Sequence, residues 1–236
     1  MINHSNLLSR VKGIDHAFLN YQQSIYFSAN IIFTSIKQVN GSEVWIFDDN
    51  IVKDPAKEIQ SDAIICHSKE TTISIITADC IPLLIASLDA EIIAVVHAGW
   101  KGLSQGIIKN TIEKINSLNT SESELFFCIG PHIMPCCYEI KKDLIESVKK
   151  TSSNKVDISL FTEIKGSDSI YLNLADWCKY LLMSEGVNPL NIESINHCTY
   201  CSAHGYGSYR RRTHHAEKKS FQYSWIKKIP AEMFSV

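Results

Sequence analysis

Long apolar runs are scarce in this 236-residue sequence. No stretch approaches the roughly 20 apolar residues that a helix needs to cross a bilayer, and residues 1–20 contain no apolar core of signal-peptide length. We therefore expect no membrane association and a cytoplasmic location. In that compartment the eight cysteines should be reduced thiols with buried, metal-binding or catalytic roles, rather than disulfides.

A strong net charge is also lacking. The formal net charge of −2 does not supply the basic surface that non-specific nucleic-acid binding requires. The sequence contains no Gly/Ser-rich or Pro-rich linker, no internal repeat and no low-complexity segment. Its 45% hydrophobic and 20% charged residues are typical of a globular protein. We therefore expect residues 1–236 to form a single domain, present as a monomer, with small molecules rather than nucleic acid as partners.

Short apolar runs alternate with helical patterns along the chain. Extended structure is predicted for residues 25–39, 43–48, 72–76, 81–86, 92–97 and 125–130, and near the stretch IESINHC. Asn40 and Gly41 form a good hairpin turn between the first two of these segments. Helices are predicted for residues 103–118, 140–150 and 172–186, the last ending at Gly186. Apolar strands interleaved with helices indicate an α/β (α+β) protein whose sheets are covered on both faces.

Two apolar runs end in chemically versatile side chains, in the stretch TADCIPLLIASLDAEIIAVVHAGWKG. If residues 81–86 and 92–97 form a hairpin around SLDA, with Ala86 opposite Glu91, then Cys80 lies directly opposite His97 on the same face of the sheet. A one-residue slip would separate them. The alternative is that both are ordinary buried residues, because cysteine is often buried and a buried histidine usually satisfies hydrogen bonds.

The segment after His97 could contribute to a site. AGWKG joins a strand to an amphipathic helix, and such a turn presents backbone N–H groups to an anion. Gly99 and Lys101 are therefore candidate binding residues, although glycine occurs in many turns of this kind.

Four motifs, TADCIPLL, VVHAGWKG, GPHIMPCCYEI and CTYCSAHGYGSYRR, follow one another between about Asp62 and Arg211. Together they closely resemble a family first called multicopper polyphenol oxidase or laccase-domain proteins and now described as YfiH-type purine nucleoside phosphorylases. The resemblance implies a layered α/β/β/α sandwich with mixed sheets. It also implies zinc-dependent phosphorolysis of purine nucleosides such as adenosine, inosine, guanosine or methylthioadenosine, with adenosine deamination as a related activity.

The resemblance also implies a metal site. The family's cysteine and histidine ligands correspond to Cys80 and His97, which would also be the catalytic residues, while its third ligand, a histidine, corresponds to Asn40. An amide oxygen is a weak ligand, so we expect weaker zinc binding, with His67 as a candidate substitute. Copper is less suited, because a multicopper site needs many histidines in paired motifs. The N-terminal part also lacks the family's S-T-R-x-G-G-V-S loop and is shortened.

The remaining clusters of cysteine, arginine and histidine give weaker indications of function. Cys198 and Cys201 form half of a zinc ribbon, but no second C-x-x-C exists and adjacent cysteines lack ribbon spacing, so no separate structural zinc is expected. Arginine suits phosphate. Two arginines of SYRR, Arg210 and Arg211, are therefore candidate substrate-binding residues, and His132 could also line the site. A solvated surface patch is expected for Arg212, His214 and His215.

Three functions remain open at this point. The first is a zinc-dependent purine nucleoside phosphorylase that uses a nucleoside and phosphate. The second is a hydrolase in which Cys80 is the nucleophile and His97 its base. The third is a family member that keeps the fold but is catalytically impaired or inactive, since Asn40 replaces the third ligand.

Overall fold

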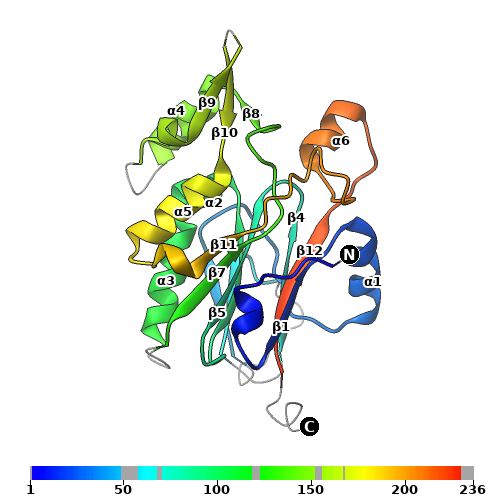
Figure 1. Ribbon diagram of the computed structural model, residues 1–236, viewed down its shortest axis with the longest axis vertical. Helices are drawn as coiled ribbons and strands as arrows, with labels where there is room; N and C mark the ends of the chain where they lie inside the picture. Colours follow the sequence, from blue (N-terminus) through cyan, green and yellow to red (C-terminus); the bar gives the residue numbers. More distant parts are fainter. Residues whose placement is uncertain are drawn as a thin grey trace.

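The structure is a computed structural model that describes residues 2–48, 58–67, 71–118, 123–151, 156–166 and 168–229. Two β-sheets pack face to face in the centre of the molecule, and helices cover the outer face of each (Figure 1). This arrangement is the predicted α/β/β/α sandwich. None of the helices in these residues combines the length and apolar character needed to cross a bilayer.

The larger central sheet has six strands in the order β11-β7-β5-β6-β3-β2. β5 (Ile81–Ser87) and β6 (Ile93–Ala98) lie in its middle and are buried along their whole length. The flanking strands are β7 (Leu125–Ile129), β11 (Ile192–Ser194), β3 (Ala63–Cys66) and β2 (Val44–Phe47). The sheet is mixed, because β11 runs parallel to β7 and β2 parallel to β3 while the other pairs are antiparallel.

The smaller central sheet is antiparallel, with the order β1-β12-β4. Its strands are β1 (Ile14–Phe18), β12 (Gln222–Lys228) and β4 (Thr72–Thr77). Alternate residues of the two sheets form the core between them, including Ile64, Ile73, Ile75, Leu84 and Val95. Because alternate residues of a strand point to opposite faces, neighbours such as Leu83 and Ile85 instead face the helices.

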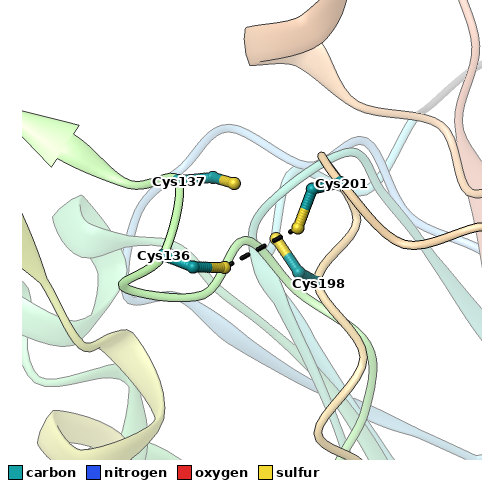
Figure 2. A group of neighbouring side chains, drawn as sticks. All are labelled: Cys136, Cys137, Cys198 and Cys201. Atoms are coloured by element: carbon teal, nitrogen blue, oxygen red, sulfur yellow. Dashed lines mark hydrogen bonds between the residues drawn. The ribbon is translucent and has the colours of Figure 1, made fainter.

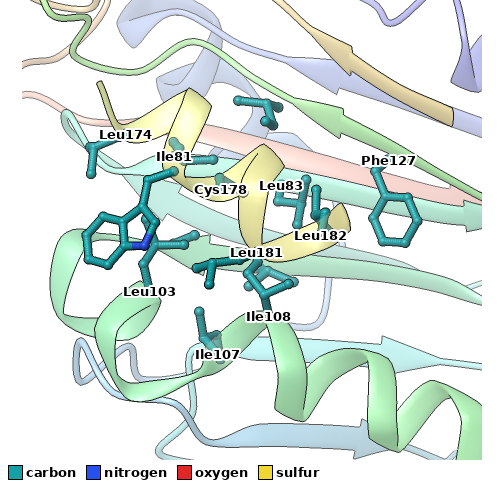
Figure 3. Close-up of a cluster of buried hydrophobic side chains, with 14 of the residues drawn as sticks. Ile81, Leu83, Leu103, Ile107, Ile108, Phe127, Leu174, Cys178, Leu181 and Leu182 are labelled. Atoms are coloured by element: carbon teal, nitrogen blue, oxygen red, sulfur yellow. The ribbon is translucent and has the colours of Figure 1, made fainter. Parts of the chain in front are cut away.

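Three helices cover the other face of the six-stranded sheet: α2 (Trp100–Gln105), α3 (Ile107–Ser117) and α5 (Leu174–Ser184). Figure 3 shows side chains of these helices packed on residues of β5 and β7. A single helix was predicted over residues 103–118. The structure instead divides this segment at Gly106, whose φ of 90° is left-handed and interrupts the helical backbone.

A third, small sheet lies at one end of the molecule, with β8 (Glu139–Ile140), β10 (Ser169–Leu172) and β9 (Thr162–Lys165) in that spatial order. Helix α4 (Lys142–Thr151) lies beside it (Figure 1). Three short 3-10 helices span Leu8–Arg10, Ile158–Phe161 and Pro189–Asn191, and helix α6 (Tyr209–His215) precedes β12. The helices predicted over 140–150 and 172–186 are thus confirmed, the second with Gly186 in a left-handed conformation just after its end.

The prediction of extended structure over residues 25–39 is wrong for its first part. Residues 21–30 form helix α1 (Tyr21–Asn30), which begins with a reciprocal capping box between Asn20 and Gln23. The helix packs on the outer face of the smaller sheet, where Phe27 contacts the ring of Tyr223 and Ser24 accepts a hydrogen bond from the Tyr223 N–H. End capping and the packing of one helical face therefore decide the structure of this segment.

The hairpin predicted at Asn40 and Gly41 is also absent. Asn40 does adopt a left-handed turn conformation, with φ of 59°. However, β2 pairs with β3 in parallel, so the segment before the turn is not its partner. The turn is held instead by Asp62, whose carboxylate accepts the N–H groups of Asn40 and Gly41. The strands predicted over 43–48, 72–76, 81–86, 92–97 and 125–130 are confirmed.

Candidate active site

Cys80 and His97 lie on the same face of the β5–β6 hairpin, but not in the predicted register. His97 is opposite Pro82, and Ile81 is opposite Ala98, so the pairing is shifted by two residues. The cause lies in the turn. The Ser87 hydroxyl donates to the Asp89 carboxylate and accepts the Ile92 N–H, which moves the closing pair of the hairpin. A two-residue shift preserves the face of each side chain, so Cys80 and His97 remain diagonal neighbours that line the same cavity.

His97 is oriented by a buried carboxylate. Its Nδ1 lies 2.8 Å from Oδ1 of Asp62, a residue with no solvent exposure. Because a carboxylate can only accept, Nδ1 carries the proton and Nε2 is left for Cys80 or another partner. Burial favours the neutral form of His97, but its interactions with Cys80 and Asp62 outweigh this effect and raise its pKa to about 10. A metal at Nε2 would have to displace a proton.

Asp62 is itself held by a set of donors. Besides His97, the N–H groups of Val39, Asn40 and Gly41 donate to its two oxygens. Burial favours the protonated form, yet these hydrogen bonds prevail and lower the pKa of Asp62. Asp62 was not predicted as a site residue, because a single aspartate before a strand carries no spacing signal that links it to a histidine 35 residues later.

Cys80 sits at a bend that the backbone of Asp79 creates with a φ of 87°. The Asp79 carboxylate accepts from the Thr199 hydroxyl at 2.6 Å and from the Arg210 N–H at 2.7 Å. Gly99 leaves room for the sulfur, since a Cβ atom at that position would lie only 2.8 Å from Cys80 Sγ. The position of the thiol thus depends on three separate segments of the chain.

These residues open into a cavity of about 650 Å³, a size within the range of small-molecule sites. Cys80 and His97 line it together with Asn40, Gly99 and Lys101. Apolar side chains, including Trp100, Ile133 and Leu174, form part of the remaining wall. The cavity therefore combines a reactive Cys–His pair with cationic groups and a surface suited to a flat, apolar ring.

Arg210 is the arginine of the SYRR motif that lines this cavity. Its guanidinium lies 5.2 Å from the ring centre of Tyr138 and donates through Nη1 to the Glu139 carbonyl. Burial raises the pKa of the Tyr138 hydroxyl. These contacts fix the position of Arg210 in the cavity wall.

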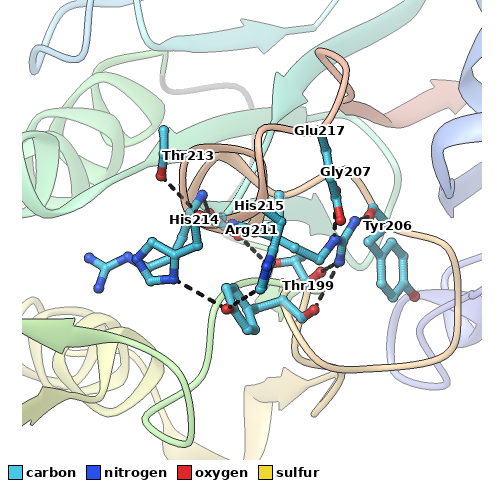
Figure 4. Close-up of polar contacts among 12 residues, drawn as sticks. Thr199, Tyr206, Gly207, Arg211, Thr213, His214, His215 and Glu217 are labelled. Carbon is cyan, nitrogen blue, oxygen red and sulfur yellow. Dashed lines mark hydrogen bonds and ion pairs between the residues drawn. The ribbon is translucent and has the colours of Figure 1, made fainter.

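Arg211 has a different environment (Figure 4). Its Nη1 donates to the carbonyls of Thr199 and Tyr200, its Nη2 to that of Tyr206, and its Nε pairs with Glu217 at 3.0 Å. It does not line the cavity formed by the described residues. The structure therefore places Arg211 where it fixes the loop of residues 199–206.

Two predicted histidines also lie outside the cavity wall. His132 is fully buried, and its Nδ1 lies 2.8 Å from the Gly130 carbonyl. His67 follows the end of β3 at which Cys66 pairs with Ile93, four residues along β6 from His97. His67 therefore cannot replace the missing third ligand. In the predicted basic patch, the exposed His214 and His215 contact the Tyr200 hydroxyl (Figure 4).

The cysteines of the two remaining motifs come together, which the spacing argument did not anticipate. Cys136 and Cys137 lie on one loop and Cys198 and Cys201 on another, and their four sulfur atoms lie within 4.8 Å of one another (Figure 2). The two pairs are about 60 residues apart in the sequence, so neither predicts the position of the other.

Comparison with known proteins decides the family. The family described as Multi-copper polyphenol oxidoreductase laccase matches residues 12–221. The chain belongs to this family. A protein named purine nucleoside phosphorylase, from Clostridium acetobutylicum, is 37% identical over 187 residues, which cover 77% of this chain and 69% of the relative. Adenosine deaminase RL5, from an unknown prokaryotic organism, is 31% identical over 150 residues, which cover 64% and 56%.

Solved structures have the same layered fold as this chain. YlmD from Geobacillus stearothermophilus superposes with a TM-score of 0.76 at 17% sequence identity, and the match covers 94% of each chain. At this level of identity the comparison establishes the layered fold and leaves the activity to the site itself.

The donor set of this laccase-family member fits a metal only in part. The Cys80 sulfur and the His97 Nε2 are donors that zinc prefers, and a carboxylate on the other histidine nitrogen is the usual support of such a ligand. Among the described residues, no third histidine, cysteine or carboxylate joins them in a ligand group. Asn40 lines the same cavity and is the remaining candidate. The cavity wall contains one histidine, far from the several that a multicopper centre needs.

Proposed function

We propose that this chain is a purine nucleoside phosphorylase whose reaction centre is the Cys80–His97 pair. The observation that carries the proposal is the cavity itself, in which the pair lies together with Lys101 and Arg210 on a partly apolar wall. Family membership and the relatives named purine nucleoside phosphorylase support it.

The substrates follow from the chemistry of the wall. Phosphate is an anion, and the Lys101 ammonium and the Arg210 guanidinium are cations that can hold it and offset its charge during transfer. The purine ring is flat and apolar on its faces, as are Trp100 and Tyr138. In the reaction, a phosphate oxygen forms a bond to ribose C1′ while the bond from C1′ to purine N9 breaks. The products are the free base and ribose 1-phosphate.

Zinc is the cofactor that we propose for this cavity, held by Cys80 and His97 with Asn40 as a weak third ligand. When bound, a zinc ion supplies Lewis acidity. The protein's own contribution is positional: Asp62 fixes the orientation of His97, and Gly99 leaves space for the sulfur. The substitution of the third ligand by an amide leads us to expect weak affinity.

The test is product formation by the purified protein. Incubation with zinc, phosphate and adenosine or inosine should yield a free purine and ribose 1-phosphate. Formation of inosine from adenosine would instead indicate deamination, as the name of one relative suggests.

The phosphate-binding role of Arg210 is tested separately. Arg210→Met should raise KM for phosphate. The matched control is Arg212→Met, because Arg212 contacts the Tyr209 ring and does not line the cavity. Absence of all products, with folded protein, would contradict the proposal.

A cysteine hydrolase is the second candidate, and one observation favours it. Asp62 is hydrogen-bonded to His97 at 2.8 Å, and His97 lines the same cavity as Cys80. This is the order of groups by which a histidine activates a thiol nucleophile. A chelator should leave such an enzyme active and iodoacetamide should inactivate it. The rate at which iodoacetamide labels Cys80, with and without zinc, distinguishes the two candidates, because a zinc ligand is protected until the metal leaves.

A further inference from the structure

The group formed by Cys136, Cys137, Cys198 and Cys201, here called the four-cysteine cluster, lies apart from the Cys80–His97 cavity. None of its members lines that cavity. Cys136 and Cys137 belong to the turn between β7 and β8, and Cys198 and Cys201 to the turn after β11. Figure 2 shows the side chains of the two loops directed toward one another.

The spacing of the sulfur atoms matches a metal centre. The Cys136 and Cys201 sulfurs are 3.7 Å apart, and all four lie within 4.8 Å of one another. Four sulfurs at about 2.3 Å from a tetrahedral zinc ion are separated by roughly 3.8 Å. All four cysteines are free, and a disulfide would require sulfurs about 2 Å apart. The cluster therefore needs only small side-chain movements to enclose an ion.

The cluster has a buried side and an exposed side. Cys198 is buried and Cys137 is half-buried. Cys136 and Cys201 are exposed, so an ion can enter from solvent.

The backbone that carries the cysteines is already fixed. An isolated bridge joins His132 to Cys198, and the Thr199 N–H donates to the His132 carbonyl at 3.0 Å. The two loops are therefore held side by side before any ion binds. Such preorganisation lowers the conformational cost of ligation.

We propose that the four-cysteine cluster is a structural Zn²⁺ site that joins the loop of residues 135–137 to that of residues 198–201. Binding replaces the thiol protons, which pass to solvent, with four sulfur–zinc bonds. The site would also stabilise the candidate active site. Tyr138 follows Cys137 and lines the cavity, and Thr199 follows Cys198 and holds the Asp79 carboxylate beside Cys80.

The test is the zinc content of the full chain, purified under reducing conditions and measured by mass spectrometry. We expect one zinc that remains in Cys80→Ser and is lost in Cys136→Ser and in Cys201→Ser. Cys178→Ala is the matched cysteine control, because Cys178 is buried in helix α5 and is not a member of the cluster. Cobalt added to the metal-free protein should give the intense visible absorption of tetrahedral thiolate coordination. These readouts do not depend on enzymatic activity, so they separate this proposal from the proposed function.

A second measurement covers the case in which a variant does not fold. In the wild-type chain, zinc should protect the four cluster cysteines from alkylation by N-ethylmaleimide, and removal of zinc by a chelator should expose them and lower Tm. Peptide mapping identifies which cysteines react. The proposal is overturned if the reduced protein takes up no zinc at these cysteines, or if they react equally fast with N-ethylmaleimide in the presence and absence of zinc. It is also overturned if Cys136 and Cys201 form a disulfide and its reduction does not produce a zinc site.

Discussion

At the scale of single residues, Asp62 is the main support of the Cys80–His97 pair. It is fully buried, and its carboxylate holds both the His97 ring and the turn at Asn40 and Gly41. Asp62→Asn should keep the shape of the side chain but remove the charge and allow the other orientation of the imidazole. Loss of such a supporting partner typically costs about 10- to 100-fold in activity or metal affinity. The measurement is kcat/KM for nucleoside phosphorolysis.

The control for this prediction is Asp15→Asn, because Asp15 does not line the cavity. Its carboxylate pairs with Lys227 at 3.8 Å and accepts the His16 N–H, a contact that the asparagine oxygen can keep. Asp15→Asn should change neither kcat/KM nor zinc content. If Asp62→Asn behaved in the same way as this control, the carboxylate would have no part in orienting His97.

Asn40 gives the second prediction at this scale. Its left-handed backbone, with φ of 59°, is one that histidine also adopts more readily than most residues. Asn40→His should therefore be tolerated and should provide an imidazole in the cavity that Cys80 and His97 line. We expect zinc binding there to tighten by at least about 10-fold, the lower end of what a supporting partner alone contributes.

The measurement is a zinc titration of Asn40→His in competition with a chromogenic chelator. A Cys201→Ser background removes the contribution of the four-cysteine cluster. Asn40→Ala is the control and should bind zinc no more tightly than the wild type. An unchanged dissociation constant in Asn40→His would show that residue 40 cannot reach an ion held by Cys80 and His97.

At the scale of the secondary-structure elements, the junction of α2 and α3 depends on the backbone conformation of one glycine. Gly106 adopts a φ of 90° there, and its N–H donates to the Leu103 carbonyl. Gly106→Ala places a Cβ in the left-handed region and should lower the free energy of unfolding by about 1–2 kcal/mol. Gly106→Asn should cost less, because asparagine tolerates this conformation. Urea unfolding of the three proteins checks the order, and equal stability of the alanine variant would contradict it.

Several elements were predictable because their local pattern and their burial agree. The strands over 72–77, 81–87 and 93–98 are short apolar runs that are largely buried, and the stripe that includes Ile108, Ile112 and Ile115 marks a helix. Helix α1 was missed because its stability comes from an end cap and from packing on β12, neither of which alters the hydrophobic periodicity.

The candidate site was predictable only in part, for a related reason. Residue spacing within one hairpin brought Cys80 and His97 to one face, but the two-residue shift depends on side-chain hydrogen bonds of Ser87. Asp62 and the four-cysteine cluster depend on contacts between segments far apart in the chain, which no local spacing encodes.

At the scale of the whole molecule, residues near the N-terminus join the two central sheets. The Ser5 N–H donates to Nε2 of His16 in β1 at 2.8 Å, and the Ser5 hydroxyl donates to Glu193 in β11 at 2.5 Å. The first contact belongs to the smaller sheet and the second to the larger one. Because His16 must be neutral to accept the Ser5 N–H, protonation of one buried ring weakens a connection between the layers.

The pH dependence of stability tests this connection. Burial, and then the neighbouring His4, lowers the pKa of His16 to about 4 from an ordinary value of 6.5. The unfolded chain therefore binds the proton more readily between these values, so the contribution of His16 is fully present above pH 6.5 and is lost as pH falls through 4. A shift of this size corresponds to about 3 kcal/mol in the free energy of unfolding.

Urea unfolding at pH 7.5, 5.5 and 4.5 should show that the free energy of unfolding of the wild type declines with falling pH. His16→Gln keeps an acceptor for Ser5 without titrating, so its slope should be shallower, and equal slopes would contradict the assignment.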